Sequence, residues 1–184
     1  MHEIEPFYNW RHLYTSEDDS MSPFYGREYS DIYFTHTVYN YYIHPQWDDF
    51  GSNTLYLKIL YADYPRGTAI IELLGEWNDC LYNDIMFLKR NVIEPLMENG
   101  IIQFILIGEN VLNFHYSDTA YYEEWAEEIE NGWIVCIGML PHVIAEMRKG
   151  RLGHYVILED KLNELPWRTF LPENLIIKVL EMIV

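Results

Sequence analysis

Residues 67–108 constrain the fold more than any other stretch of this chain. They read GTAIIELLGEWNDCLYNDIMFLKRNVIEPLMENGIIQFILIG: a short apolar run, a long amphipathic run and a second short apolar run, with a glycine closing each apolar run. Short apolar runs favour buried strands, and apolar residues three and four apart favour a helix. The stretch therefore predicts a strand–helix–strand unit with a right-handed crossover between parallel strands.

The amphipathic run predicts one long helix that ends at Asn99-Gly100. Pro95 lacks an N–H group and disfavours helical geometry in the preceding residue, so we expect a kink or an early last turn there. The flanking strands are predicted over 68–74 and 101–107, and Gly75–Asp79 and Gly108-Glu109-Asn110 are predicted to connect strand to helix as turns. The apolar stripe of the helix comprises Leu81, Ile85, Leu88, Val92 and Leu96.

The same alternation continues to the end of the chain. It predicts a helix over 119–130, a strand over 132–138, a short helix over 142–149, a last strand over 154–158 and a terminal helix over 171–184. Upstream, aromatic and β-branched residues predict antiparallel strands over 31–44 and 54–61. We expect an α/β fold, with an N-terminal aromatic arm (1–30) and a single domain (31–184). Its mixed sheet has an N-terminal antiparallel meander followed by parallel strands joined by crossover helices.

The net charge of −17 limits the partners that this chain can bind. Strong negative charge repels phosphate backbones and anionic lipid headgroups, so we expect no nucleic acid and no membrane partner. The simplest interpretation of the negative charge is that it keeps the protein soluble. The alternative is that it attracts a basic protein partner.

The two cysteines, Cys80 and Cys136, form no CxxC motif and predict two free thiols in a reducing compartment. The first residues lack the basic start and apolar core of a signal peptide. No apolar run reaches the roughly 20 residues that a membrane helix needs. These features predict a cytoplasmic protein.

The motifs that bind nucleotides or zinc, and the nucleophile elbow of hydrolases, are missing from the sequence. No cofactor is therefore expected, and no catalytic residue is assigned. If the chain binds a small ligand or is an enzyme, its pocket should lie at the C-terminal ends of the parallel strands. The residues expected there are Glu76, Trp77, Asn78, Glu109, Asn110 and His142.

No segment supplies three converging metal ligands, so no metal site is assigned. Were a metal found, the first candidates would be His36, His44, Asp48 and Asp49, which lie on or just after the strand predicted over 31–44.

Four of the five glutamates in the helix over 119–130 form two like-charge pairs, Glu123/Glu127 and Glu124/Glu128. Each pair costs about 0.2–0.5 kcal/mol in an isolated helix, and no basic residue within the helix offsets them. A solvated face is the favoured interpretation. The alternative is docking to a basic surface, and the basic cluster at 148–151 could meet this helix within the molecule or across a dimer.

Tyrosines crowd the strand predicted over 31–44. Alternation puts Tyr33, Tyr39 and Tyr41 on one face and Tyr42 on the other. Tyrosine buries apolar area and keeps a polar tip, which suits both a core and an interface. Core packing and contact with a partner both remain open.

The predicted order of elements over 54–149 resembles STAS-type domains, the anti-sigma-factor-antagonist-like fold. Leu73-Leu74-Gly75 before the long helix and Trp125 in the next helix are similar to the lipid-binding or regulatory branch of that group. Regulatory members carry a phosphorylatable Ser or Thr at the start of the long helix. This chain has Asn78, Asp79, Cys80 and Asn83 there, so a phosphorylation switch is not expected and no site residue is carried over.

The leading hypothesis is a non-catalytic, regulatory protein that binds a protein partner or itself as a homodimer. It depends on the missing catalytic motifs, the tyrosine-rich strand and the acidic helix, which place the expected contact residues on Tyr33, Tyr39, Tyr41, Tyr42, Glu123, Glu124, Glu127 and Glu128.

Overall fold

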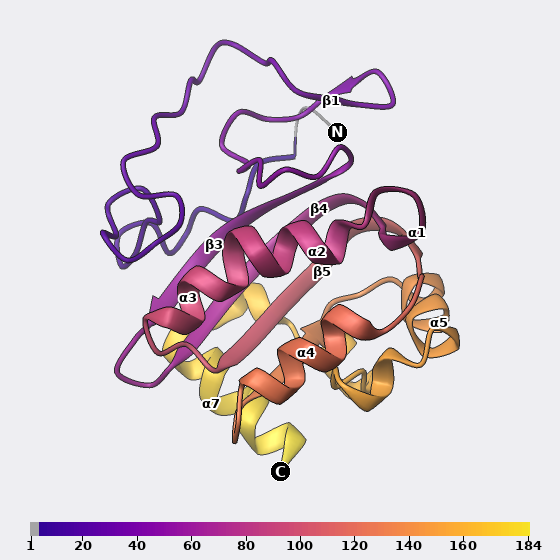
Figure 1. Cartoon of the computed structure of the whole chain (residues 1–184). Coiled ribbons are helices and arrows are strands. Elements are labelled where there is room, and N and C mark those ends of the chain that lie inside the picture. Colours follow the sequence, from indigo (N-terminus) through magenta and orange to yellow (C-terminus); the bar gives the residue numbers. More distant parts are fainter. Residues whose placement is uncertain (1–3) are drawn as a thin grey trace.

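A four-stranded mixed sheet lies at the centre of the computed structural model, which describes residues 4–184 (Figure 1). The strands, in their order across the sheet, are β3 (Leu55–Asp63), β4 (Thr68–Asn78), β5 (Gln103–His115) and β6 (Trp133–Ile137). β3 pairs antiparallel with β4, whereas β4, β5 and β6 pair in parallel. This confirms the predicted α/β fold with a mixed sheet.

Helices connect the parallel strands and cover both faces of the sheet. They are α1 (Asp79–Tyr82), α2 (Asp84–Leu88), the π-helical turn η1 (Lys89–Ile93), α3 (Glu94–Glu98), α4 (Ala120–Glu128), α5 (Pro141–Lys149), the 3₁₀ turn η2 (Leu152–His154), α6 (Asp160–Asn163), the 3₁₀ turn η3 (Trp167–Thr169) and α7 (Pro172–Ile183). Figure 1 shows α2, α3 and α4 on one face of the sheet and α7 on the other.

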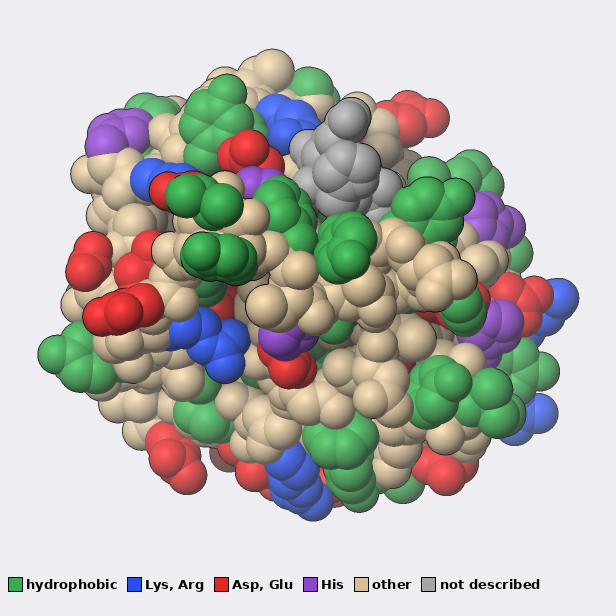
Figure 2. All heavy atoms as spheres, turned by 90° about the horizontal axis from the view of Figure 1, so that it is seen from above, with side chains coloured by type: hydrophobic (Ala, Val, Ile, Leu, Met, Phe, Trp, Pro, Cys, Tyr) green, Lys and Arg blue, Asp and Glu red, His purple; other side chains and the backbone are tan. Residues whose placement is uncertain are grey.

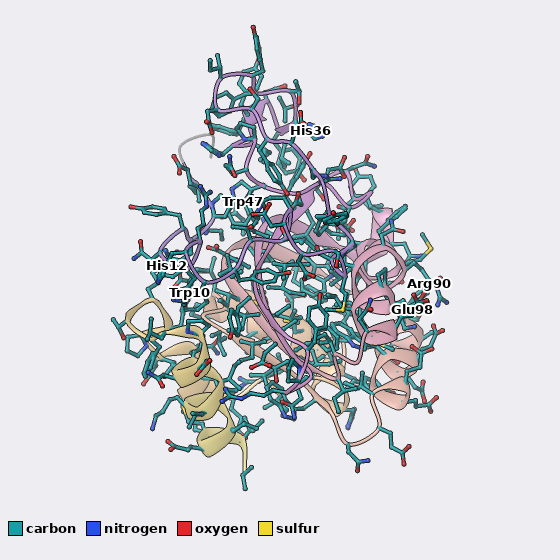
Figure 3. The ribbon with its side chains drawn as sticks, turned by 90° about the vertical axis from the view of Figure 1, so that its left-hand side faces the viewer. Trp10, His12, His36, Trp47, Arg90 and Glu98 are labelled. Atoms are coloured by element: carbon teal, nitrogen blue, oxygen red, sulfur yellow. The ribbon has the colours of Figure 1, made fainter. Side chains whose placement is uncertain are left out.

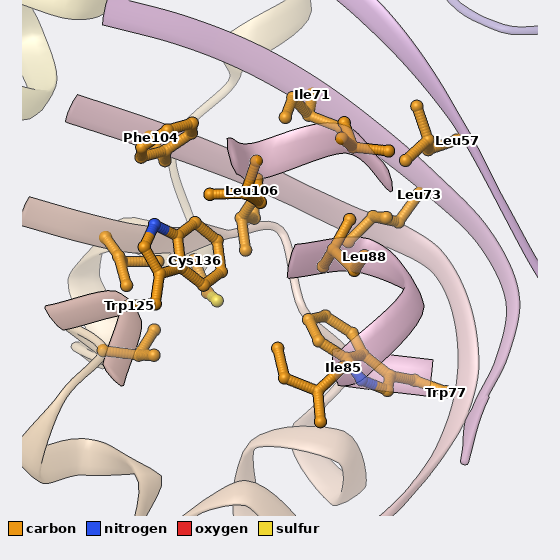
Figure 4. Packing of buried hydrophobic residues seen from close by; sticks show 14 of the residues in the cluster. Leu57, Ile71, Leu73, Trp77, Ile85, Leu88, Phe104, Leu106, Trp125 and Cys136 are labelled. Carbon is orange, nitrogen blue, oxygen red and sulfur yellow. The ribbon is translucent and has the colours of Figure 1, made fainter. Parts of the chain in front are cut away.

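Alternate strand residues separate the two faces. Leu57, Ile71 and Leu106 point into a core that includes Trp125 and the buried side of α2 and η1 (Figure 4). Ile70 and Ile105 point the other way, into a second core formed with α7. Both faces of the parallel strands are therefore buried, as the continuous apolar runs predict.

The N-terminal segment also covers part of the sheet face that packs against α7. Phe7 and Trp10 join the core beside α7. Farther along, Tyr56 of β3 and Leu74 of β4 pack under Val38, Ile43 and Trp47. Figure 1 shows residues 4–54, which we call the N-terminal layer, outside the edge strand β3 and extending beyond the end of the sheet. Phe7, Trp10 and Trp47 thus pack on the sheet of their own chain, whereas Tyr8 and Tyr25 are exposed.

The single long helix predicted after β4 is broken into shorter pieces. Asn83 takes a left-handed conformation (φ 53°) and separates α1 from α2. Leu81 is 74% exposed on α1, so its assignment to the apolar stripe is wrong, while Ile85, Leu88, Val92 and Leu96 are buried. The π-helical turn η1 ends just before Glu94-Pro95. Pro95 cannot donate a hydrogen bond to the preceding turn, which explains the break there.

β4 and β5 are longer than predicted. Gly75–Asn78 continues β4, so the predicted connection is wrong up to Asn78. Gly75 allows this, because its φ is 119° and an added Cβ would lie 2.1 Å from the Thr54 carbonyl oxygen. Gly108 and Glu109 also lie inside β5, at a shift of its register with β4, and not in the predicted turn.

Two predicted strands are wrong. Within 31–44, only Thr37–Val38 (β1) and Tyr41–Tyr42 (β2) pair, as a small hairpin separate from the main sheet. Only Val38 and Ile43 of this segment are buried apolar residues, which is too little to hold a long strand on a core. The strand predicted over 154–158 reduces to one parallel bridge between Val135 and Ile157, because the turn η2 occupies the start of that segment.

Within residues 4–184, every helix is too short or too polar to cross a lipid bilayer.

Candidate functional site

A cavity of about 340 Å³ lies in the N-terminal layer, above the end of β3 that carries Tyr56. Figure 3 shows Trp47 toward the sheet and His36 farther out in this layer. The cavity wall is mixed, with aromatic rings, two imidazoles, a guanidinium and two carboxylates. The lining residues are Arg27, Glu28, Tyr29, Ser30, Tyr33, Thr35, His36, Ile43, His44, Pro45, Trp47, Asp49 and Tyr56.

A buried ion-pair network holds this layer on the sheet. Asp48 bridges to Leu57 through the backbone, and its Oδ1 accepts hydrogen bonds from the Arg27 guanidinium (2.9 Å) and the Tyr29 hydroxyl (2.5 Å). Lys58 of β3 lies 3.6 Å from the Asp48 Oδ2 atom, and its ammonium stands 3.8 Å from the Tyr29 ring centroid. Burial raises the pKa of Asp48, although these partners favour its charged form.

The two histidines of the cavity have separate partners. The Nδ1 atom of His44 accepts a hydrogen bond from the Gln46 amide (3.2 Å), so Nε2 carries the proton and faces Glu5 at 3.5 Å. His36 Nε2 lies 3.4 Å from Asp49 Oδ2. Of the residues first considered for a metal, His36 thus faces Asp49, whereas His44 faces Glu5 and Asp48 faces Arg27 and Tyr29.

Tyr56 lines the floor of the cavity. Its side chain is only 5% exposed, its ring meets the His36 ring edge-on at 5.8 Å, and its hydroxyl has no hydrogen-bond partner in the described residues 4–184. Burial, followed by the charge of Asp49, raises the pKa of this hydroxyl to about 12. The hydroxyl is therefore protonated at neutral pH and available to a ligand.

The tyrosines predicted to pack or to bind are on the surface. Tyr33, Tyr39, Tyr41 and Tyr42 are 74%, 66%, 58% and 53% exposed, and Ile32 beside them is 78% exposed. Tyr33 also lines the cavity. Figure 2 views the molecule from this side and shows hydrophobic side chains standing out among acidic and histidine side chains. We call Ile32, Tyr33, Tyr41 and Tyr42 the tyrosine rim.

Tyr39 turns away from the tyrosine rim toward the carboxyl ends of β4 and β5. Tyr39 and Asn40 form the hairpin turn with φ values of 49° and 66°, and the Tyr39 hydroxyl donates a hydrogen bond to Glu76. Glu76 Oε1 also contacts Asn113 Nδ2 (3.3 Å) and His115 Nε2 (3.2 Å). A depression of about 500 Å³ opens beside this group, lined by Tyr39, Asn78, Cys80, Leu81, His115, Tyr116 and Glu146.

The six residues predicted for a pocket at the strand ends do not share one surface. Glu76 and Asn78 lie by the depression, but Trp77 is fully buried in the core. Glu109 instead accepts hydrogen bonds from Trp167 (2.7 Å) and Arg168 (2.9 Å) beside the α7 core. Asn110 is half-buried on β5, and exposed His142 has its Nε2 atom 2.6 Å from the Leu112 carbonyl oxygen.

No basic residue lies within the acidic helix α4, but Lys89 and Arg90 of the neighbouring turn η1 partly neutralise its glutamates. Lys89 is fully buried, and its ammonium contacts Glu94 (2.9 Å), Glu128 (2.8 Å) and Glu124 (3.3 Å). Arg90 adds a second contact to Glu124 at 3.2 Å. Glu123 and Glu127 remain exposed.

The basic cluster does not supply these contacts. Arg148 pairs with Asp160 and Lys149 with Glu146, so the suggested contact between residues 148–151 and α4 within the molecule is wrong.

Sequence reasoning missed the aromatic floor and wall of the cavity, Tyr29, Trp47 and Tyr56. One signal was present: Tyr56 and Lys58 alternate with Leu55, Leu57 and Ile59, so β3 turns a charged and a phenolic side chain to one face. A lysine on a buried strand requires a carboxylate layer above it, and Asp48 supplies that carboxylate.

Comparisons of the chain with protein-family models, with curated proteins and with solved structures give no match. The resemblance to STAS-type domains is therefore supported only as a mixed α/β fold with a four-stranded sheet and helices.

Proposed function

We propose that this protein is a non-catalytic binding module whose N-terminal layer contacts a basic segment of a protein partner. The observation that carries the proposal is the tyrosine rim, where four large side chains are each more than half exposed within one short segment. Tyrosines of this kind supply contact area together with a hydrogen-bonding tip, and they are enriched where proteins bind one another.

Charge favours a basic partner over a second copy of this chain. At a net charge of −17, two copies repel each other, whereas a basic segment is attracted from a distance. The exposed Glu123 and Glu127 add to this field, and Glu124 and Glu128 contribute less because Lys89 and Arg90 pair with them. Self-association as a homodimer is the alternative outcome.

As part of this proposal, the likeness to STAS-type domains suggests a regulatory role. It is supported by an antiparallel edge strand that precedes three parallel strands with helices between them. It adds no site residue.

The test uses blocked ten-residue peptides that carry either three lysines or three glutamates. We expect the lysine peptide to bind, and the double variant Tyr41→Ser/Tyr42→Ser to weaken binding at least fivefold. Tyr8→Ser is the matched control, because Tyr8 is 60% exposed outside the tyrosine rim. Equal loss in both variants, or no binding of the lysine peptide, would contradict the proposal. Sedimentation of a dimer that the double variant dissociates would assign the surface to self-association.

A second candidate function is small-ligand binding or catalysis at the carboxyl ends of β4 and β5. It is favoured by the cluster of Glu76, His115 and Tyr39 beside a depression of about 500 Å³. A metabolite screen in which a compound stabilises the wild type but not His115→Ala would support it. Stabilisation of neither protein by any compound would count against it.

A further inference from the structure

We propose that the cavity in the N-terminal layer receives a cationic side chain, lysine or arginine, from the partner. This inference rests on the proposed function, because Tyr33 of the tyrosine rim also lines the cavity. The cavity volume of about 340 Å³ is at the small end of ligand pockets and suits one long side chain.

The wall of the cavity has the composition that binds organic cations. Four of its lining residues, Tyr29, Tyr33, Trp47 and Tyr56, are aromatic, and the face of an aromatic ring is electron-rich and attracts cations. Asp49 and Glu28 add two carboxylates at the same wall. Aromatic rings combined with carboxylates stabilise ammonium and guanidinium groups that have left water.

The positive groups of the wall do not cancel this preference. Arg27 is paired with Asp48 at 2.9 Å and donates to the Asp49 carbonyl oxygen at 3.1 Å, so its charge is already neutralised. His44 directs its Nε2 atom toward Glu5 at 3.5 Å, and His36 directs its Nε2 atom toward Asp49 at 3.4 Å. The carboxylates of Asp49 and Glu28 then determine the sign of the local charge.

The same layer already holds one ammonium group in this way. Lys58 is buried with its Nζ atom 3.8 Å from the centroid of the Tyr29 ring and 3.4 Å from Glu17. Lys58 does not line the cavity, so this internal cation lies outside it and does not fill it. The chain thus combines an aromatic ring and carboxylates around an ammonium immediately next to the proposed site.

Tyr56 supplies an unused polar group at the floor of the cavity. Its side chain is 95% buried, and its hydroxyl makes no hydrogen bond to any described residue from 4 to 184. Because Tyr56 lines the cavity, its hydroxyl oxygen can accept a hydrogen bond from a ligand N–H group.

The experiment uses two probes, n-butylammonium chloride and the blocked lysine peptide, and follows the Trp47 indole N–H signal by NMR. We expect both probes to shift this signal, the peptide at lower concentration. Asp49→Asn should weaken the binding of both probes about fivefold, and Tyr56→Phe should weaken it about threefold. Each variant removes one polar contact and keeps the shape of the side chain. Sodium propionate is the anionic control, and Tyr25→Ala is the control for an exposed aromatic that does not line the cavity.

The outcomes separate this inference from the proposed function. If peptide binding falls in Tyr41→Ser/Tyr42→Ser but is unchanged in Asp49→Asn and Tyr56→Phe, the proposed function stands and the cavity inference is overturned. If n-butylammonium binds as tightly as the peptide, the cavity takes a free organic cation and the assignment to a protein side chain is overturned. If the Trp47 signal shifts with propionate and not with n-butylammonium, the cavity binds an anion and the cavity inference is overturned. Unchanged thermal midpoints in all variants show that folding is not the cause.

Discussion

Glu72 and Lys89 are fully buried charged side chains on opposite faces of the sheet, and their surroundings differ. Glu72 on β4 accepts one hydrogen bond from the Phe7 amide (2.7 Å), while its Oε1 atom has no hydrogen bond in the described residues and lies 3.6 Å from Arg168. Lys89 is surrounded by three glutamates. Glu72 thus lacks some of its hydrogen-bond partners, whereas Lys89 has a full set of charged partners. The two residues should therefore respond differently to substitution.

Glu72→Gln should stabilise the protein at neutral pH and not at pH 4. Burial raises the pKa of Glu72 from 4.5 to about 7. Between these pH values the folded protein binds more protons than the unfolded chain, so the free energy of unfolding falls as pH rises through this window. Above pH 7, Glu72→Gln should exceed wild type in free energy of unfolding by about 3 kcal/mol. Urea unfolding from pH 4 to 8 measures it, with exposed Glu181→Gln as control. A pH-independent difference between Glu72→Gln and wild type would contradict the assignment.

Lys89→Met should destabilise the protein and create a cation site. Burial opposes the charge of Lys89, but the hydrogen bonds that its ammonium donates to Glu128, Glu94 and Glu124 outweigh this effect and raise the pKa of Lys89. Carboxylate oxygens of these glutamates lie within 4.8 Å of one another, so they repel once the ammonium is gone. We expect a loss of roughly 2 kcal/mol, reduced from the cost of a fully buried pair because the glutamates are partly exposed.

Calcium should recover part of that loss in Lys89→Met and none in wild type, since carboxylate oxygens are the ligands it prefers. Thermal unfolding with and without about 5 mM calcium, a concentration above the dissociation constants of weak calcium sites, decides this, and equal effects on both proteins would contradict it.

At the scale of elements, β4 depends on one glycine. Gly75→Ala places a Cβ 2.1 Å from the Thr54 carbonyl oxygen at a φ of 119°. Backbone atoms cannot move aside as a flexible side chain can, so we expect a loss of about 3 kcal/mol or more. Gly153→Ala is the matched control, because nothing lies within 4 Å of its added Cβ, and it should change stability by less than about 0.5 kcal/mol. The denaturant midpoints of the two variants measure this difference. Equal losses of stability in both variants would contradict the predicted clash at Gly75.

The order and type of the main elements could be predicted because their apolar periodicity is strong. Ile85, Leu88, Val92 and Leu96 fall on one buried stripe, and the run at 101–107 is buried on both faces. Leu81 was misplaced because Asn83 ends its helical turn with a left-handed residue that periodicity does not report. The extension of β4 past Gly75 depends on contact with Thr54, a residue 21 positions earlier, which no local pattern encodes.

The cavity could be predicted less well than the sheet. His36, His44 and Asp49 were grouped from proximity in sequence, and they do line one cavity. Tyr56 comes to the same place from a different strand, and Asp48 is buried by an ion-pair network with residues 27, 29 and 58. Such sites are assembled by tertiary packing, so sequence spacing alone cannot find them.

At the scale of the whole molecule, the two ends of the chain are joined by aromatic contacts. Phe7, Trp10 and Trp167 form an edge-to-face group with centroid distances of 4.9–5.9 Å. The Trp10 indole N–H donates to the Phe170 carbonyl oxygen at 3.0 Å, across 160 residues of sequence. Figure 3 shows Trp10 next to the C-terminal helix. The N-terminal layer, which carries the cavity, is held to the rest of the fold partly by this group.

Trp10→Ala should therefore loosen the N-terminal layer and lower overall stability together. Removing a 97%-buried tryptophan leaves a large void and an unpaired carbonyl, which costs about 3–5 kcal/mol. Limited proteolysis should then cleave first within residues 11–30, and urea unfolding should begin at lower concentration than in the control Tyr8→Ala, whose side chain is 60% exposed. If the layer were held by the Asp48–Lys58 network alone, Trp10→Ala would lower global stability without earlier cleavage of the arm. Cleavage rates and unfolding midpoints measured on the same samples separate the two outcomes.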